Sequence, residues 1–348
     1  MKNNRIQLLD CTLRDGGFGL EDCNKTSIKT KTYNTQLTEK IISLFSRSNI
    51  DIIELGAIEI TNNDVTKFCI YQSIEEVSKN IPLKLSNDEQ MYVALFRGPD
   101  TPIEAIPNWN EKYCKGIRVI IRYSELKKSL DFCKALSEKG YKVFVQPMLT
   151  LRYTEEEIDL LIKYSNEMNA YALYFVDSYG YMDENDIKRF LKRYDEGLNK
   201  DIRIGFHAHN NINLAFSNAK EFINNQFDRN IIVDSCVMGM GQGAGNLQTE
   251  LISDYLNKNF DKKYDYDKIL EVCEIIEEFT PEPLWGYRLT TLLPAINKVA
   301  YKYSINLRKN YDLSYVQINY LLKNIPEELR HRYTEQNLQK LLKILKKD

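Results

Sequence analysis

Short apolar runs alternate with longer amphipathic stretches along most of the chain. The runs are rich in β-branched residues and have the length of strands, whereas the stretches between them repeat apolar residues at helical spacing. Eight strands are predicted, at Ile6–Asp10, Ile50–Leu55, Tyr92–Phe96, Ile117–Ile121, Lys142–Gln146, Ala172–Val176, Ile202–His207 and Ile231–Cys236. Helices are predicted between them, at Thr38–Ser48, Ser73–Lys79, Glu125–Lys139, Thr154–Met168, Asp183–Tyr194 and Leu214–Asn225. The third unit is irregular, because four Gly and Pro residues between 98 and 107 leave room for only a short helix.

Polar residues gather where the predicted strands end. In chain order they are Arg14 and Asp15, Glu54, Arg97, Arg122, Gln146, Asp177 and Ser178, His207 and His209, and the glycine-rich segment 239–246. An open, doubly wound sheet would concentrate its ligand-binding groups at one switch point, whereas these groups follow every strand. We therefore predict a closed (β/α)₈ TIM barrel with its active groups at the carboxyl ends of the strands.

The C-terminal quarter of the chain has no strand signal. Residues 248–257 would form the eighth barrel helix, and from Tyr266 onward only helices are predicted. Pro281, Pro283 and Gly286 interrupt them before a helix at 290–303, and a last one covers 338–345. The predicted division is a catalytic barrel over residues 1–258 and a helical region over 259–348 that covers the barrel or forms a dimer contact.

Composition narrows the function classes. With 348 residues, 47 Lys+Arg against 49 Asp+Glu and a formal net charge of −2, the chain has no basic field to attract nucleic acid or an anionic membrane. Its seven cysteines are scattered without a CxxC pair and are interpreted as reduced thiols. No signal-peptide or membrane-spanning pattern is recognised, so the cytoplasm is the predicted compartment.

His207 and His209 stand two residues apart at the end of one apolar run, so on a strand both imidazoles would point to the same face. Asp15, at the end of another run, offers a carboxylate. Imidazole and carboxylate together suit a divalent ion. The plainer alternative is that the histidines only cap a strand and that Arg14 and Asp15 form a rim ion pair.

Three stretches resemble one enzyme family. They are Leu9–Gly17 (LDCTLRDGG), His207–Ala215 (HAHNNINLA) with Asn218, and Gly241–Asn246 (GQGAGN) with Glu250. In this order they are similar to the metal-dependent lyase and condensing-enzyme TIM barrels, which include 4-hydroxy-2-oxovalerate aldolase, HMG-CoA lyase and isopropylmalate synthase. The 4-hydroxy-2-oxovalerate aldolase branch is the most similar, and Asp177–Met182 resembles that branch as well.

The resemblance implies a metal site and an activity. Asp15, His207 and His209 would ligate a divalent metal ion, with Asn246 as a further contact. Mn²⁺ and Mg²⁺ are favoured, and Zn²⁺ and Co²⁺ are alternatives that the sequence does not separate. The implied reaction is aldol cleavage or formation through the enolate of a pyruvate-like 2-oxo acid, whose carbonyl the ion polarises.

The resemblance also implies roles for groups around the metal. Arg14 would stabilise the enolate oxygen, Glu54 would orient Arg14, and Ser178 would hold the substrate carboxylate. Arg97 and Arg122 are either binding groups for a second substrate anion or ordinary surface charges.

One position departs from the aldolase pattern. Those aldolases carry a general-base histidine just after ArgAspGly, where this chain has Phe18, and its third histidine, His331, lies in the helical tail. We therefore expect the hydroxyl proton to go elsewhere, to a metal-bound water, Tyr123, Tyr179 or Tyr287. The last matches a tyrosine of those aldolases to within one residue and is the predicted catalytic residue.

Two other functions remain open. An acyl-CoA-dependent condensing synthase is disfavoured because Gly16–Phe18 does not match the GlyGluGln of that branch. A catalytically silent barrel subunit is favoured by Phe18 and disfavoured by the retained ligands. The DGGF start also resembles barrels of surface polysaccharide biosynthesis, which suggests a sugar-derived aldehyde. Small-molecule 2-oxo acid and aldehyde partners and a homo-oligomer are expected, while the aldehyde dehydrogenase partner of the related aldolases is not carried over.

Overall fold

Parallel strands form a closed barrel in the computed structural model, which describes residues 5–25, 32–60, 67–83, 89–225, 228–280 and 285–343. The barrel order is β1-β9-β8-β7-β6-β5-β4-β2, and pairing of β1 with β2 closes it. The two-residue strand β3 (Ile70–Tyr71) adds to the end of β2. The eight barrel strands are β1 (Ile6–Asp10), β2 (Ile52–Ile58), β4 (Met91–Phe96), β5 (Gly116–Ile121), β6 (Lys142–Pro147), β7 (Ala172–Asp177), β8 (Arg203–Ala208) and β9 (Ile231–Ser235). All eight predicted strands, and the barrel itself, are confirmed.

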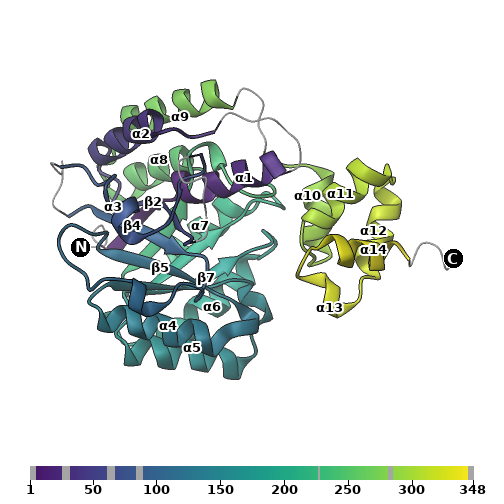
Figure 1. Cartoon of the computed structure of the whole chain (residues 1–348), viewed down its shortest axis with the longest axis horizontal. Helices are drawn as coiled ribbons and strands as arrows, with labels where there is room; N and C mark the ends of the chain where they lie inside the picture. Colours follow the sequence, from purple (N-terminus) through teal and green to yellow (C-terminus); the bar gives the residue numbers. More distant parts are fainter. Residues whose placement is uncertain are drawn as a thin grey trace.

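Helices cover the outside of the barrel (Figure 1). They are α1 (Gly17–Lys25), α2 (Thr35–Arg47), α3 (Ile74–Ser78), α4 (Leu126–Glu138), α5 (Glu155–Glu167), α6 (Glu184–Gly197), α7 (Ala215–Asn224), α8 (Thr249–Phe260) and α9 (Tyr266–Phe279). Because helices outside and side chains inside bury both faces, β2, β7 and β9 are buried along their whole length. After β4 only a 3₁₀ turn at Ile103–Ala105 forms, as the prolines there predict. No helix in the described ranges is both long enough and apolar enough to cross a bilayer.

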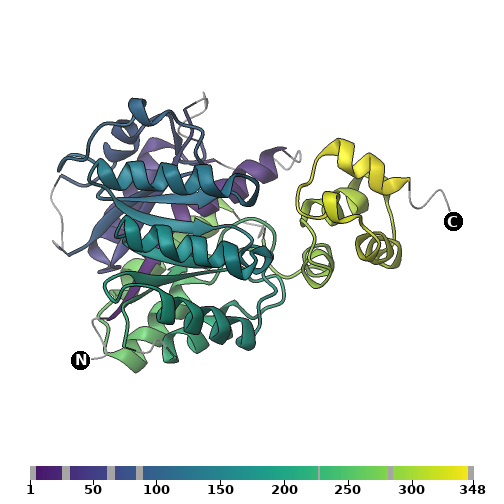
Figure 2. The ribbon, with the colours of Figure 1, turned by 90° about the horizontal axis from the view of Figure 1, so that it is seen from below.

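Five further helices form a separate lobe beyond the carboxyl ends of the strands (Figures 1 and 2). They are α10 (Leu289–Ile296), α11 (Lys302–Tyr311), α12 (Tyr315–Lys323), α13 (Glu327–Arg330) and α14 (Glu335–Leu342). Residues of this C-terminal lobe, among them Val299, Tyr303, Leu321 and Leu338, pack into a small core of their own. The lobe therefore lies over the face where a barrel carries its active groups.

Three features differ from the sequence-based expectation. The helix α9 buries Ile269, Val272 and Ile276 in the barrel core, so it belongs structurally to the barrel although the predicted boundary lies at residue 258. The single helix predicted at 290–303 is two helices, because the chain turns between them with Lys298 in the left-handed region, at φ 55°. The helix α1, which was not predicted, follows β1 through a π-helical turn at Thr12–Gly16. The predicted breakers Pro281 and Pro283 and the end of the last predicted helix, 344–345, lie outside the described residues.

Candidate active site and metal centre

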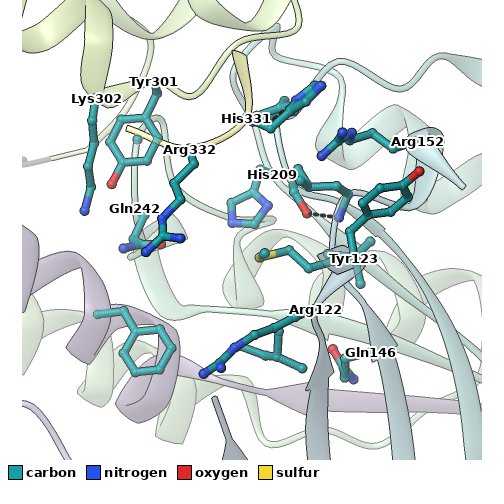
Figure 3. Close-up of a pocket in the computed structure, with 18 of the residues that line it drawn as sticks. Arg122, Tyr123, Gln146, Arg152, His209, Gln242, Tyr301, Lys302, His331 and Arg332 are labelled. Atoms are coloured by element: carbon teal, nitrogen blue, oxygen red, sulfur yellow. Dashed lines mark hydrogen bonds between the residues drawn. The ribbon is translucent and has the colours of Figure 1, made fainter. Parts of the chain in front are cut away.

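A cavity of about 910 Å³ lies between the carboxyl end of the barrel and the C-terminal lobe. The barrel contributes these predicted rim residues to its wall: Arg14, Asp15, Arg97, Arg122, Gln146, Ser178, His207 and His209. The lobe contributes Tyr301, Lys302, His331 and Arg332, which face the barrel groups across the cavity (Figure 3). The size suits a small substrate held by a few polar groups.

Asp15, His207 and His209 meet in this cavity. One side-chain donor atom from each lies within 4.8 Å of the others. Oδ2 of Asp15 is 3.5 Å from Nε2 of His207 and 3.8 Å from Nε2 of His209. The two imidazole rings lie 4.9 Å apart between centroids, because residues two apart on a strand share a face. The geometry therefore brings together the three side chains that the sequence proposes as ligands.

The outer nitrogens of both imidazoles are already engaged. Nδ1 of His207 lies 2.9 Å from Oδ2 of Asp234, and Nδ1 of His209 lies 3.0 Å from the carbonyl oxygen of Asp177. A proton on each Nδ1 directs both Nε2 atoms toward Asp15. Burial lowers the pKa of His207, but its hydrogen bonds to Asp15 and Asp234 outweigh burial and hold that pKa well above the usual value, so a bound cation would take the place of the proton on Nε2. Metal-ligating histidines are commonly oriented by such partners, so the donor set fits a divalent ion.

Asn246 lies next to Asp15. Its Nδ2 donates to Oδ2 of Asp15 at 2.6 Å and to the carbonyl oxygen of Met240 at 2.7 Å. Its Oδ1 is buried and has no hydrogen-bond partner among the described residues. The glycine loop allows this approach, since a Cβ on Gly241 would collide with Nδ2 of Asn246. A buried oxygen without a partner, in the amide group that contacts Asp15, is a second feature that fits a bound cation.

The electrostatics of the cluster keep Asp15 ionised. Burial raises the pKa of its carboxyl group, but Arg14 and His207 outweigh burial and hold that pKa well below its usual range. Burial and the neighbouring His207 lower the pKa of His209 to about 4, so His209 is neutral at pH 7. An ionised carboxylate beside a neutral imidazole is the state that a metal ion requires.

A buried ionic network lies below the cluster. Arg14 donates to Asp15 at 2.5 Å and through Nε to Glu54 at 2.8 Å. Glu54 also accepts from Arg118 at 2.5 Å, and Arg118 pairs with Asp234, which holds His207. Arg118 and Asp234 are not among the residues predicted from the sequence. Their signal was a charged residue inside an otherwise apolar strand, because such a residue needs a buried partner.

The other predicted binding residues line the cavity but have protein partners. Ser178 accepts a hydrogen bond from the backbone N–H of Leu149 at 2.8 Å. Arg97 pairs with Glu21 at 2.6 Å and with Glu59 at 3.0 Å. Arg122 pairs with Asp100 and with Glu125. A substrate anion would have to compete with these carboxylates for either arginine.

The predicted catalytic Tyr287 does not reach this cavity. Its side chain is 54% exposed and lines a separate surface hollow with Trp285 and Arg288. The tyrosine that the lobe does bring to the cavity is Tyr301, which donates to Asp22 on α1. The turn between α10 and α11, which the sequence did not reveal, places residue 301 there.

His331, from the C-terminal lobe, also lines the cavity. Its Nδ1 lies 2.9 Å from the hydroxyl of Tyr179, and its Nε2 lies 3.0 Å from Glu327. Nothing in the sequence indicates this position, because His331 lies far along the chain in the helical tail. Phe18 packs with Ala57, Ile70 and Leu95 in the cavity wall, under the guanidinium of Arg97 at 4.0 Å.

Comparisons with known proteins identify the family of the chain. A family model described as HMGL-like matches residues 5–276. Three curated 4-hydroxy-2-oxovalerate aldolases are similar to the chain. The Burkholderia pseudomallei protein is 28% identical over 203 residues, 55% of this chain and 57% of its own length. The Carboxydothermus hydrogenoformans protein is 24% identical over 273 residues, 78% of this chain and 76% of its own length. A Thermomicrobium roseum protein of the same name is 40% identical, but over only 31% of this chain and 29% of its own length. The chain thus spans less than two thirds of the first of these relatives.

Solved structures share the fold. The N-terminal domain of a candidate aldolase from Bacteroides vulgatus superimposes with a TM-score of 0.73 at 23% identity, over 88% of this chain and 98% of that one. The carboxyl transferase domain of Rhizobium etli pyruvate carboxylase, with pyruvate and biocytin, gives a TM-score of 0.72 at 14% identity, over 99% of this chain and 61% of that one. At these identities the likeness establishes the barrel architecture.

Proposed function

Because the chain belongs to the HMGL-like family, we propose that it is a divalent-metal-dependent aldolase or carbon–carbon lyase that acts through the enolate of a pyruvate-like 2-oxo acid. One observation carries the proposal: the donor atoms of Asp15, His207 and His209 converge in the cavity, with the guanidinium of Arg14 bonded to Asp15. Mn²⁺ or Mg²⁺ is the favoured ion.

The donor set supplies a place for the ion, and the surrounding residues supply charge and position. When bound by Asp15, His207 and His209, the ion would polarise the keto group of a 2-oxo acid. Arg14 would stabilise the negative charge that develops on the enolate oxygen, because its guanidinium is fixed before the reaction by Glu54. Ser178 is the proposed contact for the substrate carboxylate.

Gln146 adds a further donor on the barrel side of the cavity (Figure 3). Its Nε2 is buried and has no hydrogen-bond partner among the described residues. A buried amide without a partner costs free energy, so a substrate oxygen is its natural complement.

Two guanidinium groups that line the cavity have no carboxylate partner in the described part of the chain. They belong to Arg152 and Arg332. Arg152 stacks on the ring of Tyr123 at 4.3 Å, which fixes its direction. Since Arg97 and Arg122 are already ion-paired, we assign recognition of an anionic group on the aldehyde to Arg152 and Arg332. A phosphorylated or carboxylated sugar-derived aldehyde would meet this requirement.

The second candidate function is acyl-CoA-dependent condensation on the same barrel. The barrel is shared with a structure described as an HMG-CoA lyase from Acenitobacter baumannii in complex with coenzyme A and 3-methylmalate. The TM-score is 0.60 at 14% identity, over 80% of this chain and 92% of that one, a likeness that supports the fold and not the reaction. The condensing reaction predicts release of free CoA, which a thiol reagent detects.

Proton exchange at the methyl group of pyruvate in D₂O tests the leading proposal. We expect NMR to show exchange that requires added Mn²⁺ or Mg²⁺ and is lost in His207→Ala. Exchange in the absence of metal, or exchange that persists in the variant, would contradict it. Absence of exchange, together with release of free CoA from an acyl-CoA, would favour the condensing reaction over the aldolase reaction.

A further inference from the structure

A hydrogen-bonded chain of three side chains connects the barrel rim to the C-terminal lobe. Tyr179 follows β7, next to Ser178, and its hydroxyl lies 2.9 Å from Nδ1 of His331. Nε2 of His331 lies 3.0 Å from Oε1 of Glu327, one turn earlier on α13. The rings of Tyr179 and His331 stack with centroids 5.9 Å apart. Tyr179 and His331 both line the cavity, so this hydrogen-bonded series of side chains begins where a substrate would lie.

The partners fix the direction of these bonds. Glu327 has a pKa held below its usual range, first by its hydrogen bond to His331, so its carboxylate accepts the Nε2 proton. The Nδ1 atom then carries the lone pair and accepts from the hydroxyl of Tyr179. The three groups are arranged as in a catalytic triad: Tyr179 holds the proton, His331 is the base, and the carboxylate of Glu327 orients the base.

His331 is the imidazole left over for proton transfer. The chain has three histidines, and the other two direct their Nε2 atoms at Asp15. The ring of Phe18 in the cavity wall cannot take up a proton. We propose that Tyr179 and His331, oriented by Glu327, relay the proton of the aldol hydroxyl group, an assignment that rests on the proposed aldolase function.

The carbon–carbon cleavage step balances in protons and electrons without a further reactant, and the enolate takes up its proton at C3 in a later step. In cleavage of a 4-hydroxy-2-oxo acid, the substrate O–H bond breaks and its proton passes to the oxygen of Tyr179, which hands its own proton to Nδ1 of His331. The oxygen electron pair forms the aldehyde C=O as the C3–C4 bond breaks, and the bonding pair becomes the enolate. Condensation returns the proton by the same path.

The surroundings of His331 keep it ready to accept. The charged and titratable groups facing it are Tyr179 from the barrel, Arg152 after β6, and Glu327 and Arg330 on α13. Burial first, and then the charge of Arg152, lower the pKa of His331 below its usual value, against the opposing effect of Glu327. The imidazole is therefore neutral at pH 7 and becomes charged only while it holds the relayed proton.

Two reactions of the full-length Mn²⁺ enzyme separate the relay from the enolate site. Oxaloacetate decarboxylation forms the pyruvate enolate without any hydroxyl proton to remove. Condensation of pyruvate with aldehydes needs the relay, and the panel is acetaldehyde, glycolaldehyde, glyceraldehyde and glyceraldehyde 3-phosphate. The variants are Tyr179→Phe and His331→Asn. Tyr181→Phe is the matched control, since its ring stacks on Tyr179 at 5.8 Å and it does not line the cavity.

We expect Tyr179→Phe and His331→Asn to lower the condensation rate about 10²- to 10³-fold while decarboxylation stays within about twofold. Tyr181→Phe should leave both rates unchanged. Equal loss of the two activities in the relay variants would overturn the relay, because it would indicate a structural contact between lobe and barrel. So would unchanged condensation, or a wild type that decarboxylates oxaloacetate but condenses no aldehyde. A wild type that performs neither reaction would refute the proposed function itself.

The pH profile gives a readout that a structural role would not move. Glu327→Gln removes the negative charge that favours protonated His331, so the pKa of the imidazole falls further. In condensation the relay donates the proton, so protonated His331 is the active form and its pKa sets the basic limb. That basic limb should move to lower pH and the rate at neutral pH should fall, while the profile of decarboxylation stays in place. A fixed basic limb in Glu327→Gln would contradict the relay.

Discussion

Nδ1 of His207 lies 2.9 Å from Oδ2 of Asp234, and both side chains are buried inside the barrel. Asp234 also accepts from the hydroxyl of Tyr174 at 3.0 Å and pairs with Arg118. Its position on β9, one strand away from His207 on β8, therefore fixes the imidazole ring with Nε2 toward Asp15. The orientation of the proposed ligand depends on a residue that touches neither the cavity nor the substrate.

Asp234→Asn should weaken metal binding about 10- to 100-fold, as loss of an orienting partner does at histidine ligands. Titration calorimetry with Mn²⁺ measures the change. Asp267→Asn, an equal change of charge on an exposed residue of α9, is the control. An unchanged Kd in Asp234→Asn, with a native circular dichroism spectrum, would separate Asp234 from the metal site.

The barrel could be predicted because its signal is local. Each strand is a short run of buried β-branched residues, and eight such runs with helices between them have one compact closure. Asp15, His207 and His209 could be proposed for the same reason, because strand ends are visible in the sequence and converge in a barrel.

The rest of the site depends on distances that no local pattern contains. Arg118 and Asp234 stand inside strands, where periodicity indicates core and not chemistry. His331 reaches the cavity because the lobe packs over the barrel rim, and Tyr287 misses it because the chain turns between α10 and α11. His331 meets Tyr179, which is 152 positions earlier in the chain, and a single helix break decides that Tyr301 and not Tyr287 lines the cavity. Both outcomes are set by tertiary packing.

Glu54→Gln tests the network below the cluster. Glu54 is fully buried and accepts from Arg14 and Arg118, so removal of its charge leaves two guanidinium groups with one fewer carboxylate between them. We expect the free energy of unfolding to fall by about 3 to 5 kcal/mol. Urea unfolding measures it, and Glu125→Gln, which removes a solvent-screened partner of Arg122, should have a much smaller effect. An equal fall in the free energy of unfolding in the two variants would contradict a special contribution of the buried network to stability.

Recognition of an anionic aldehyde is tested by comparing glyceraldehyde 3-phosphate with glyceraldehyde. Arg152→Gln and Arg332→Gln should each lower the ratio of the two kcat/KM values about 10-fold or more, the effect of a lost charge-assisted hydrogen bond. The same change at Arg97 or Arg122, whose guanidinium groups are already ion-paired, should leave the ratio within about twofold. A ratio that falls only in the latter pair would restore the original assignment of those two residues.

The burial of Asp10 predicts that the free energy of unfolding depends on pH in a way that does not involve the metal site. The carboxyl group is buried at the end of β1, where the hydroxyls of Thr249, at 2.7 Å, and Thr12, at 3.1 Å, donate to Oδ2. Burial raises the pKa of Asp10 to about 7, against the opposing effect of these hydrogen bonds. In the unfolded chain the group titrates near its ordinary pKa of about 4.

Between these two values the folded state holds a proton that the unfolded state has released, so the stabilising effect of that proton is present at low pH and is lost as pH rises toward 7. Asp10→Asn is neutral at every pH and lacks this loss. We therefore expect the variant to gain roughly 2 to 3 kcal/mol relative to the wild type between pH 5 and pH 8. Urea unfolding at the two pH values measures the difference. A constant difference would mean that the hydrogen bonds from Thr12 and Thr249 keep Asp10 ionised in the folded protein despite its burial.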